Sequence, residues 1–366
     1  MRIIHCADIH LDSKLSANLT GAKKKERKIE LIQTFERMVD YAAEQEVTAI
    51  IIAGDLFDTK NVAVTPRNAV YKAIINHSEI DFYYLKGNHD ADSFLSMLEV
   101  IPDNLKLFND VWTSYTIGDL GVVTINGIEL NSDNSGLIYN SLVLDTDKVN
   151  IVTLHGQESV YQNKDKTEVI SINELKGKGI DYLALGHIHE YKLETLDRRG
   201  KYCYPGCLEG RGFDECGEHG FVILDIDEAS RTVVSEFVPF SKRRLYTVSV
   251  DVSDCMDNTD IREKMYIALG AANIGAENLV KVELTGNVDI SCDKDTELLA
   301  KTFEDDYYFI KVKDKTKLAV NYNDFSLDAS LKGEFVRLVM ADTDMDEELK
   351  AEIVRYGIQA LAGEEI

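Results

Sequence analysis

Five short polar motifs, each placed directly after an apolar segment, constrain this chain more than any other feature of its sequence. Each apolar segment has the length and composition of a β-strand. A single Asp-x-His motif often arises by chance, but five polar motifs at five strand ends are difficult to explain as packing. In chain order, the motifs are Asp8-Ile9-His10, Gly54-Asp55-Leu56-Phe57-Asp58, Gly87-Asn88-His89-Asp90, the single His155 and Gly186-His187-Ile188-His189.

The N-terminal part of the chain alternates between strand and helix patterns. Residues 48–53 are continuously apolar and largely β-branched, which is typical of a strand buried on both faces. Residues 27–46 place apolar side chains at helical spacing. The alternation predicts a parallel sheet flanked by helices, in the order strand 3–7, helix 27–46, strand 48–53, helix 66–77 and strand 82–86.

From residue 111 to residue 240 the pattern becomes richer in strands and turns. We therefore expect a second sheet that packs on the first, so that residues 1–240 form a layered α/β sandwich. The clearest strands of this part are 122–125, 150–154, 181–185 and 221–224.

The pattern changes again near residues 239–244. Residues 245–315 read as strand, helix, strand, helix and strand, which suits a small α+β domain. Residues 325–366 are helical in pattern, with an apolar stripe that includes Leu331, Phe335 and Leu338. We expect a chain of three parts.

Composition favours a protein of the cytoplasm. The chain has 366 residues, enough for two domains, and charges interrupt every long apolar stretch, so no membrane-spanning segment is expected. The N-terminus runs straight into a strand, and we expect no cleavable signal peptide. The six cysteines include no Cys-x-x-Cys pair, which favours reduced thiols in the cytoplasm over a disulfide framework or a zinc site.

The formal net charge of −24 is a poor match to nucleic acid, because phosphates attract Lys and Arg. A nucleic-acid function would depend on bound metal ions, a partner or a local basic patch. One candidate patch could equally be a solvated helix start; it consists of Lys23, Lys24, Lys25, Arg27 and Lys28.

The side chains of the motifs are those that divalent metals such as Mn²⁺ prefer: carboxylate, imidazole and amide oxygen. Asp55 is an anionic carboxylate with two oxygens and is the natural bridge between two cations. Glycine precedes a ligand at Gly54, Gly87 and Gly186, where it lets the chain turn and approach the ions closely. The expected metal ligands are Asp8, His10, Asp55, Asn88, His155, His187 and His189.

His89 is expected to act differently from the ligands, because it is too close to Asn88 in sequence for both to bind metal comfortably. Two ions about 4 Å apart can activate a water and hold both oxygens of a phosphoryl displacement. A histidine beside them suits protonation of the leaving oxygen. Asp58 and Asp90 would then orient imidazoles. The remaining histidines, His5, His77 and His219, have no evident partner and are interpreted as structural or surface residues.

In combination, the five motifs resemble those of the calcineurin-like metallophosphoesterases. Two further stretches are similar to the DNA-repair exonuclease branch typified by the bacterial SbcD nuclease subunit: residues 7–12, and residues 204–213 closing with Gly220-Phe221. Asp12, where SbcD-type proteins usually have glycine, makes the chain look closer to YhaO-like relatives. Cys207 replaces the usual serine, and we expect no effect on catalysis.

The resemblance implies a role for each matched residue. Asp8, His10, Asp55 and His189 would hold one ion, and Asp55, Asn88, His155 and His187 the other, with His89 as the catalytic acid. It also implies that residues 245–315 cap the site, that helices near 66–78 and 93–100 can form a homodimer, and that the C-terminal helices dock on an SbcC-like SMC-type ATPase. The stripe at Leu331, Phe335 and Leu338 could serve this docking or pack on the capping domain itself. The acidic run at Asp342, Asp344, Asp346, Glu347 and Glu348 argues against direct DNA contact there.

We therefore expect a Mn²⁺-dependent phosphodiesterase acting on DNA, with 3′-to-5′ exonuclease and some endonuclease activity in DNA repair. A phosphodiesterase or phosphatase for small molecules would explain the acidity better, but leaves residues 204–213 and the second domain without a role. A non-enzymatic scaffold is disfavoured by the complete set of ligands.

Overall fold

A computed structural model gives the fold of residues 1–15, 17, 19, 21–59, 62–90, 93–96, 98, 100–159, 168–289, 292–318, 325, 328–343 and 345–362. The chain divides into two compact units, Met1–Leu245 and Tyr246–Ile366. The finer division of the second unit into a capping domain (245–315) and a helical segment (325–366) remains a prediction. Asp344 of the acidic run, and Met97 and Glu99 of the segment 93–100, lie outside the described residues.

The first sheet of the N-terminal unit has six strands. Four neighbouring strands, β1 to β4, are mutually parallel, as the alternation of strand and helix predicts. Strand β13 pairs antiparallel with β1. Across the sheet the order is β14 (Thr232–Pro239), β13 (Gly220–Asp227), β1 (Arg2–Cys6), β2 (Ala49–Ala53), β3 (Asp81–Leu85) and β4 (Leu105–Leu107).

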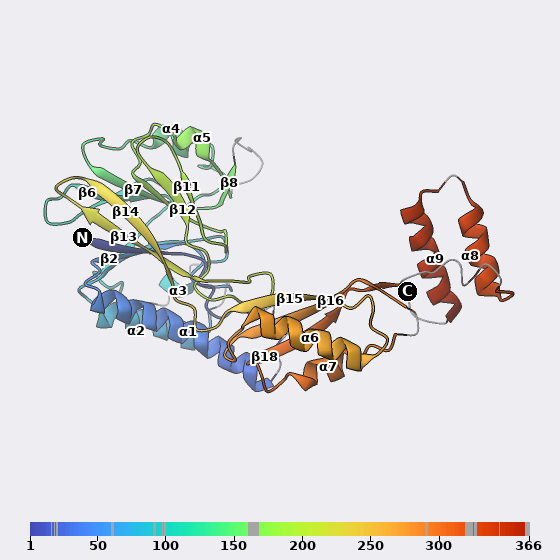
Figure 1. Cartoon of the computed structure of the whole chain (residues 1–366). Helices are drawn as coiled ribbons and strands as arrows, with labels where there is room; N and C mark the ends of the chain where they lie inside the picture. Colours follow the sequence, from blue (N-terminus) through green and yellow to red (C-terminus); the bar gives the residue numbers. More distant parts are fainter. Residues whose placement is uncertain are drawn as a thin grey trace. The chain divides into compact units, whose positions relative to one another are not determined.

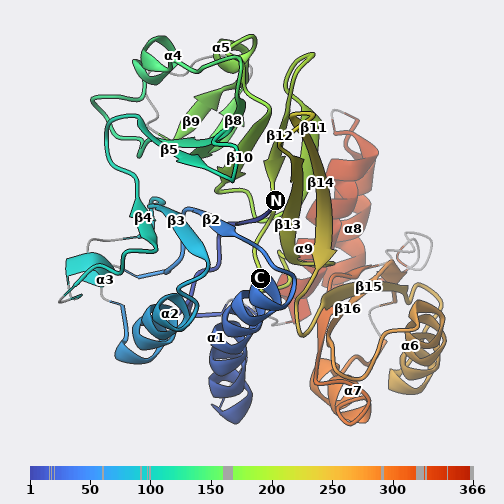
Figure 2. The same cartoon turned by 90° about the vertical axis from the view of Figure 1, so that its left-hand side faces the viewer.

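Two helices, α1 (Gly21–Glu44) and α2 (Val64–Asn76), cover the outer face of this sheet (Figures 1 and 2). Leu31, Phe35 and Met38 of α1 pack against apolar side chains of β1, β2 and β3. Helix α1 begins six residues before the expected start at residue 27. The added residues include three Lys and one Glu, which favour helix but carry no apolar periodicity. A single turn, α3 (Ser93–Ser96), follows β3.

A second sheet of six strands packs on the first. Short helices α4 (Ile138–Ser141) and α5 (Ile172–Leu175) cover its outer face (Figures 1 and 2), and β8 (Gln157–Ser159) pairs with β9 (Val169–Ser171) beside it. Across the second sheet the order is β11 (Lys192–Thr195), β12 (Lys201–Tyr204), β10 (Tyr182–Gly186), β7 (Val149–His155), β6 (Val123–Gly127) and β5 (Thr113–Ile117).

Alternate side chains of both sheets meet in one apolar layer. Ile51 and Leu85 of the first sheet, and Ile125, Ile151 and Ala184 of the second, are fully buried there. Successive residues of a strand point to opposite faces of the sheet. The residues between those of the apolar layer therefore point outward, toward the helices. The predicted layered α/β sandwich is confirmed, with helices outside two stacked sheets.

The second unit contains a three-stranded sheet in the order β15 (Leu245–Asp251), β16 (Leu279–Thr285) and β18 (Phe309–Asp314). Helices α6 (Asn258–Ala272) and α7 (Thr296–Thr302) share an apolar core with this sheet. Asp257 and Asp295 cap the two helices by accepting backbone N–H groups of the first turn. A two-stranded pair, β17 (Asn287–Val288) and β19 (Lys317–Leu318), completes the α+β module.

The C-terminal helices α8 (Leu331–Ala341) and α9 (Glu347–Ala362) pack against each other through Val336, Val339, Val354 and Ile358. The predicted stripe is divided: Phe335 packs against this core, whereas Leu331 and Leu338 remain 71% and 65% exposed. None of the helices in the described ranges is long and apolar enough to span a bilayer.

Candidate metal centre

The five motifs leave the carboxyl ends of strands from both sheets. Asp8 and His10 follow β1, the 54–58 motif follows β2, and the 87–90 motif follows β3. His155 is the last residue of β7, and His187 and His189 follow β10. Because the sheets are stacked, these ends meet at one edge of the sandwich, which is where α/β sheets place their reactive crevice.

The backbone at the site is held in an unusual conformation. Asp8, His10, Asp55 and His187 have positive φ angles of 50°, 48°, 52° and 102°. Non-glycine residues rarely adopt this region, and they cluster at functional sites where the surrounding structure compensates the strain. Here the compensation includes backbone hydrogen bonds between the two loops, from Asp8 N to Gly54 O and from His10 N to Asp55 O (3.1 and 2.9 Å).

The three glycines that precede ligands serve two different purposes. Gly54 has φ +92°, so it provides the expected turn. At Gly87 and Gly186 the reason is space. A Cβ on Gly87 would lie 2.1 Å from Asp55 Oδ1, and one on Gly186 would lie 1.9 Å from Ala53 O. These glycines allow the loop of one strand to lie against the ligands of another.

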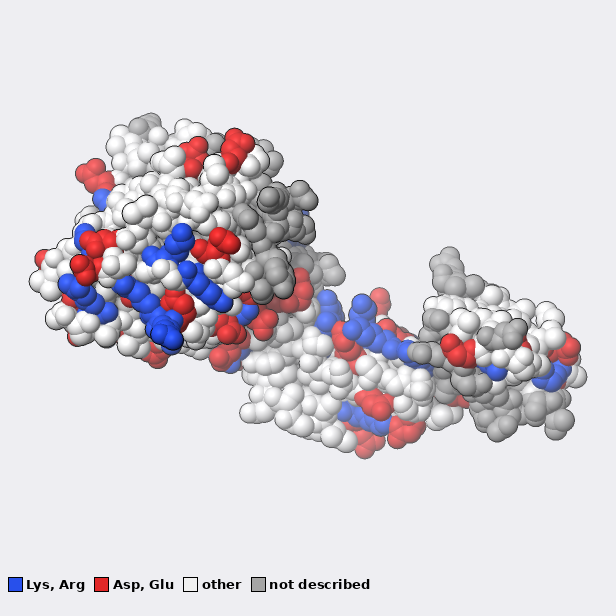
Figure 3. Space-filling view, turned by 90° about the horizontal axis from the view of Figure 1, so that it is seen from above, with Lys and Arg blue, Asp and Glu red and all other residues white. Residues whose placement is uncertain are grey.

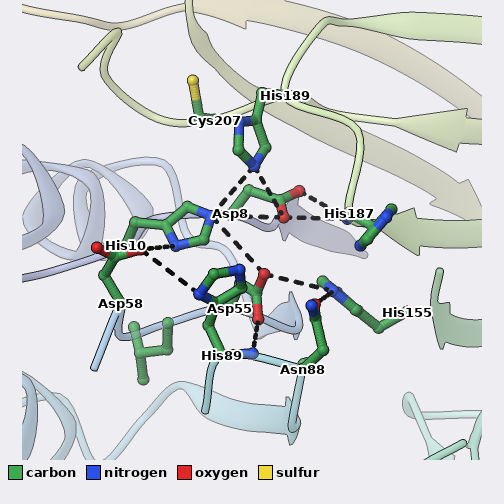
Figure 4. A network of polar contacts seen from close by, with 12 residues as sticks. Asp8, His10, Asp55, Asp58, Asn88, His89, His155, His187, His189 and Cys207 are labelled. Carbon is green, nitrogen blue, oxygen red and sulfur yellow. Dashed lines mark hydrogen bonds and ion pairs between the residues drawn. The ribbon is translucent and has the colours of Figure 1, made fainter. Parts of the chain in front are cut away.

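A first group of acceptor atoms joins Asp8, His10 and His189 (Figure 4). The Nε2 atoms of His10 and His189 are 3.1 Å apart, and Asp8 Oδ1 lies 4.0 and 3.8 Å from them. Asp55 Oδ2 is 3.7 Å from His10 Nε2. The first group therefore contains the four side chains expected around one ion.

A second group is built around His155. Its Nε2 lies 3.5 Å from Asp55 Oδ2 and 3.0 Å from Asn88 Oδ1, while its Nδ1 donates to Ala53 O at 2.9 Å. Asp55 Oδ2 thus lies within 3.7 Å of an imidazole in each group, which is the arrangement required of a bridging carboxylate.

His187 does not join these groups through its side chain. Its backbone N–H donates to both oxygens of Asp8 (3.0 and 2.9 Å), and its ring lies edge-on to His155 at 5.3 Å between centroids. Figure 4 shows the contact to Asp8 made at the backbone nitrogen. The structure therefore gives His187 a role in orienting a carboxylate, which the sequence did not predict.

Asp58 and Asp90 also differ from each other. Asp58 Oδ1 lies 3.1 Å from His10 Nδ1 and 3.7 Å from His89 Nδ1, so it faces two imidazoles as expected. Asp90, expected to orient an imidazole, instead accepts backbone N–H groups of Leu56, Phe57 and Gly87 at 2.9–3.2 Å. Asp90 therefore ties the 54–58 loop to the 87–90 loop.

His89 lies at the mouth of the site. Its backbone N–H donates to Asp55 Oδ1 (2.9 Å), which orients the central carboxylate, while its side chain is 48% exposed. The ring lies edge-on to that of His10 at 5.2 Å. A half-exposed imidazole beside the acceptor groups is accessible to a substrate.

Burial and charge set the protonation of the site. Burial lowers the pKa of His155, but its hydrogen bond to Asp55 and the charges of Asp8 and Asp55 outweigh this and raise that pKa to about 9. Burial raises the pKa of Asp55, yet the contacts with His155 and His10 hold it at about 2. Burial raises the pKa of Asp8 and lowers that of His10. A buried carboxylate kept ionised among imidazoles is a common feature of functional sites.

Sequence reasoning missed two residues of the site. Glu215 Oε1 lies 2.7 Å from His189 Nδ1, and Arg211 binds Glu215 and lies 3.5 Å from Asp58. Arg211 falls within the 204–213 stretch whose sequence resembles the exonuclease branch, but no spacing rule connects it with Asp58, 153 positions earlier. His219, which lacked an evident partner, lies 3.2 Å from Cys207 Sγ and contacts Glu215 O.

The first group fits a metal ion on the chemistry of its donors. The Nδ1 atoms of His189 and His10 lie beside carboxylates, those of Glu215 and Asp58. A carboxylate favours a proton on the facing nitrogen, which leaves a lone pair on each Nε2 atom. Two lone pairs 3.1 Å apart repel unless a proton or a cation is shared between them. With carboxylates beside them, the groups suit divalent cations, and together they can hold two.

Comparison with known proteins finds relatives among metallophosphoesterases and DNA-repair proteins. The metallophosphoesterase YhaO of Bacillus subtilis is 26% identical over 238 residues, covering 62% of this chain and 57% of its own length. The DNA double-strand break repair protein Mre11 of Aeropyrum pernix is 24% identical over 69% of this chain and 64% of its own length. The corresponding Mre11 of Methanopyrus kandleri is 28% identical over 79% of this chain and 69% of its own.

The chain thus spans about three fifths of the length of the first two relatives. The profile of the calcineurin-like phosphoesterases matches residues 1–191, which is more than half of the chain and includes all five motifs. The resemblance seen in the motifs is confirmed at this level, and the chain belongs to the calcineurin-like phosphoesterase family.

Proposed function

We propose that this chain hydrolyses phosphodiester bonds of DNA with two divalent metal ions, Mn²⁺ in particular, as a 3′-to-5′ exonuclease with some endonuclease activity in DNA repair. The observation that carries the hydrolytic part is the convergence of carboxylate, imidazole and amide acceptors from five strand ends, with Asp55 between the two groups. DNA as the substrate is supported by the names of the Mre11 relatives.

In this proposal Asp55 would be a ligand of both ions. Asp8, His10, Asp55 and His189 would hold the first, and Asp55, Asn88 and His155 would hold the second, with His187 as a candidate further ligand. Bound ions would supply Lewis-acid polarisation of the phosphoryl group and activation of water. The chain itself contributes the orientation of the ligands: His187 N–H fixes Asp8, and His89 N–H fixes Asp55.

His89 is proposed as the acid that protonates the leaving oxygen. His89→Gln is expected to lower kcat on DNA by about 10²- to 10⁴-fold, the usual contribution of a general acid. The loss should be much smaller for bis-p-nitrophenyl phosphate, because nitrophenolate leaves without needing a proton. The measurement compares kcat for both substrates in Mn²⁺.

His77→Gln is the matched control, since His77 also faces carboxylates, Asp40 and Glu79, but lies at the end of α2. It should leave both rates unchanged. An equal loss on both substrates for His89→Gln would show that His89 acts on the metals or the fold, and an unchanged rate on DNA would remove it from the mechanism.

The charge of the chain gives only local support for DNA binding. Lys24 and Lys25 are exposed at the start of α1, and Lys28 Nζ lies 3.6 Å from Asp12, two residues beyond His10. Arg27 does not belong to the candidate patch, because it is buried in ion pairs with Glu30 and Glu209. On the face drawn in Figure 3, basic and acidic side chains are interspersed and form no continuous basic surface.

One observation favours a small-molecule substrate instead. A cavity of about 530 Å³ borders the site and is lined by His187, Ile188, His189, Glu190, Asp214, Glu215, Cys216, Glu218 and His219. Its volume is that of a pocket for a small ligand. Its carboxylates would repel a polyanion, so a phosphoester with a neutral or cationic substituent is the alternative.

One experiment separates these functions. The purified chain is incubated with Mn²⁺ and end-labelled linear duplex DNA, and in parallel with bis-p-nitrophenyl phosphate. Shortening of the DNA that is abolished by EDTA supports the nuclease. Hydrolysis of the small diester with intact DNA supports the small-molecule alternative, and hydrolysis of neither contradicts both.

Partners and compartment are also part of the proposal. The exposed Leu331 and Leu338 offer an apolar contact for an SbcC-like ATPase. Val64 and Ile75 of α2 are 59% and 44% exposed and could join two copies into a homodimer. We also propose that the chain works in the cytoplasm, where cysteines stay reduced.

A further inference from the structure

We propose that Arg211 and Glu215 are positioning residues that pre-orient the imidazoles of the metal centre. The inference rests on the proposed metal-dependent hydrolysis and adds to it a charged scaffold outside the ligands. Neither residue belongs to the five motifs, and neither is among the groups of acceptor atoms described above. Both act on the site through other side chains.

The segment after β12 runs directly behind His189. Cys207 N–H donates to His189 O at 3.1 Å. Gly206 has φ +76°, and a Cβ there would lie 2.8 Å from the same carbonyl oxygen. The backbone of residues 206–207 is therefore fixed against the loop that carries His189, and this determines where the following residues can reach.

Glu215 selects the ring nitrogen that His189 offers to the site. Glu215 Oε1 lies 2.7 Å from His189 Nδ1, and its side chain is 8% exposed. Carboxylate is an acceptor only, so Nδ1 carries the proton and Nε2 presents its lone pair toward Asp8 and His10. A carboxylate behind a ligating imidazole also increases the basicity of the ligand.

Arg211 joins the two carboxylates that face imidazoles. Its Nη2 donates to Glu215 Oε1 at 2.7 Å and its backbone N–H to Glu215 Oε2 at 2.7 Å. Its Nη1 lies 3.5 Å from Asp58 Oδ1, which in turn lies 3.1 Å from His10 Nδ1. One planar guanidinium thus links Glu215 behind His189 to Asp58 behind His10, and a lysine cannot reproduce both contacts from one point charge.

The short distance between Arg211 Nη2 and His189 Nδ1, 3.0 Å, needs a separate explanation. Both atoms are donors when Nδ1 is protonated, so they cannot bond to each other. Each instead donates to Glu215 Oε1, and the shared acceptor brings them together. The arrangement requires Glu215 to be ionised, and the guanidinium of Arg211 beside it stabilises this carboxylate.

A second histidine holds the turn that carries Glu215. His219 Nε2 lies 3.0 Å from Glu215 O, an acceptor, so this nitrogen carries the ring proton. Its Nδ1 can then accept from the thiol of Cys207 at 3.2 Å. Cys207, Glu215 and His219 therefore form one connected unit, in which His219 links the thiol of Cys207 to the backbone of Glu215.

The test compares Mn²⁺ affinity and stability in the full-length chain. Arg211→Lys keeps the positive charge but loses the fork, and Glu215→Gln keeps an acceptor oxygen but loses the negative charge. Both should bind Mn²⁺ roughly 10- to 100-fold more weakly in calorimetric titration, the usual effect of disturbing groups behind metal ligands. ¹⁵N shifts of the metal-free protein should show His189 losing its fixed tautomer in Glu215→Gln.

Arg199→Lys is the matched control. Arg199 binds Asp181 through Nε and Nη2 at 2.9 Å and also donates to two backbone carbonyls, but it precedes β12, away from the site. Arg199→Lys should leave Mn²⁺ affinity unchanged, whatever its effect on the melting temperature. Lowered stability with unchanged Mn²⁺ affinity in both site variants would make Arg211 and Glu215 ordinary structural residues and overturn the inference.

The outcome also separates this inference from the proposed function. If the wild-type protein binds Mn²⁺ and hydrolyses a diester, and the site variants bind Mn²⁺ equally well, only the positioning role is refuted. Wild-type protein that binds no Mn²⁺ refutes the metal-dependent function and the inference with it. If Arg211→Lys fails to fold, Glu215→Gln, which preserves side-chain shape, decides the question alone.

Discussion

Asp55→Asn is expected to reduce diester hydrolysis by roughly 10³-fold or more, because it removes the carboxylate that lies between both groups of ligands. Asp55 is 1% exposed, and Asn keeps its shape and the acceptor for His89 N–H. The fold should therefore persist while the affinity for metal falls. Metal content by mass spectrometry of the native protein, together with kcat, measures both effects.

Asp40→Asn is the control for this substitution, since it makes the same chemical change on α1, where Asp40 is 67% exposed. It should leave hydrolysis and metal content unchanged. An Asp55→Asn protein that retained two metal ions and full activity would show that another group bridges them. Loss of activity without loss of metal would place Asp55 in the chemistry and not in metal binding.

Glu30→Gln is expected to lower the free energy of unfolding by about 3–5 kcal/mol, the usual effect of breaking a buried ion pair from one side. Glu30 is 1% exposed and accepts from Arg27 at 2.7 Å, Arg243 at 2.8 Å and Lys242 at 2.9 Å. A neutral amide in its place leaves buried cations without a compensating negative charge. Urea unfolding at pH 7 gives the difference.

The same group predicts a dependence on pH. Burial raises the pKa of Glu30, but the contacts with Arg243, Arg27 and Lys242 outweigh it and hold the pKa at about 2, against 4.5 for an ordinary Glu. A carboxyl whose pKa is lower in the folded than in the unfolded protein stabilises the fold at every pH above its unfolded-state pKa. This stabilisation is lost as the pH falls through the folded-state pKa. The difference in the free energy of unfolding between wild type and Glu30→Gln should be constant above about pH 5, and it should become smaller as the pH falls from 4.5 to 2.

Glu36→Gln on the exposed side of the same helix is the control and should change stability by no more than about 0.5 kcal/mol at any pH. If Glu30→Gln were equally mild at pH 7, the ion pairs around α1 would be compensated by solvent or by local rearrangement, and the buried network would contribute little to stability.

The elements of the fold that follow from local pattern were predictable from the sequence. The buried β-branched segment before Asp55 is β2, and the apolar spacing around Phe35 is α1, because period and burial are properties of neighbouring residues. The motifs were located for the same reason, since each follows the segment that forms its strand. Short edge strands such as β4 and β11, which are only partly buried, gave no comparable signal.

The positions of charged side chains were less predictable. Both interpretations of the Lys-rich segment, a basic patch or a solvated helix start, placed Arg27 at the surface, but it is buried against Glu209, 182 residues away. Asp90 read as a partner for imidazole but binds three backbone amides. The same residue type can satisfy either environment, and the choice depends on which loops the stacked sheets bring together.

By itself the sequence determined which residues supply acceptors and on which strand ends they lie, because strand period and the direction of a parallel sheet place them at one edge. Only the tertiary structure decided how they meet. The 3.1 Å approach of His10 and His189, 179 positions apart, the backbone role of His187 and the link from Arg211 to Asp58 all depend on the stacking of two sheets. Contacts between distant loops are set by sheet packing and by strained backbone at positive φ, and neither is encoded in local spacing.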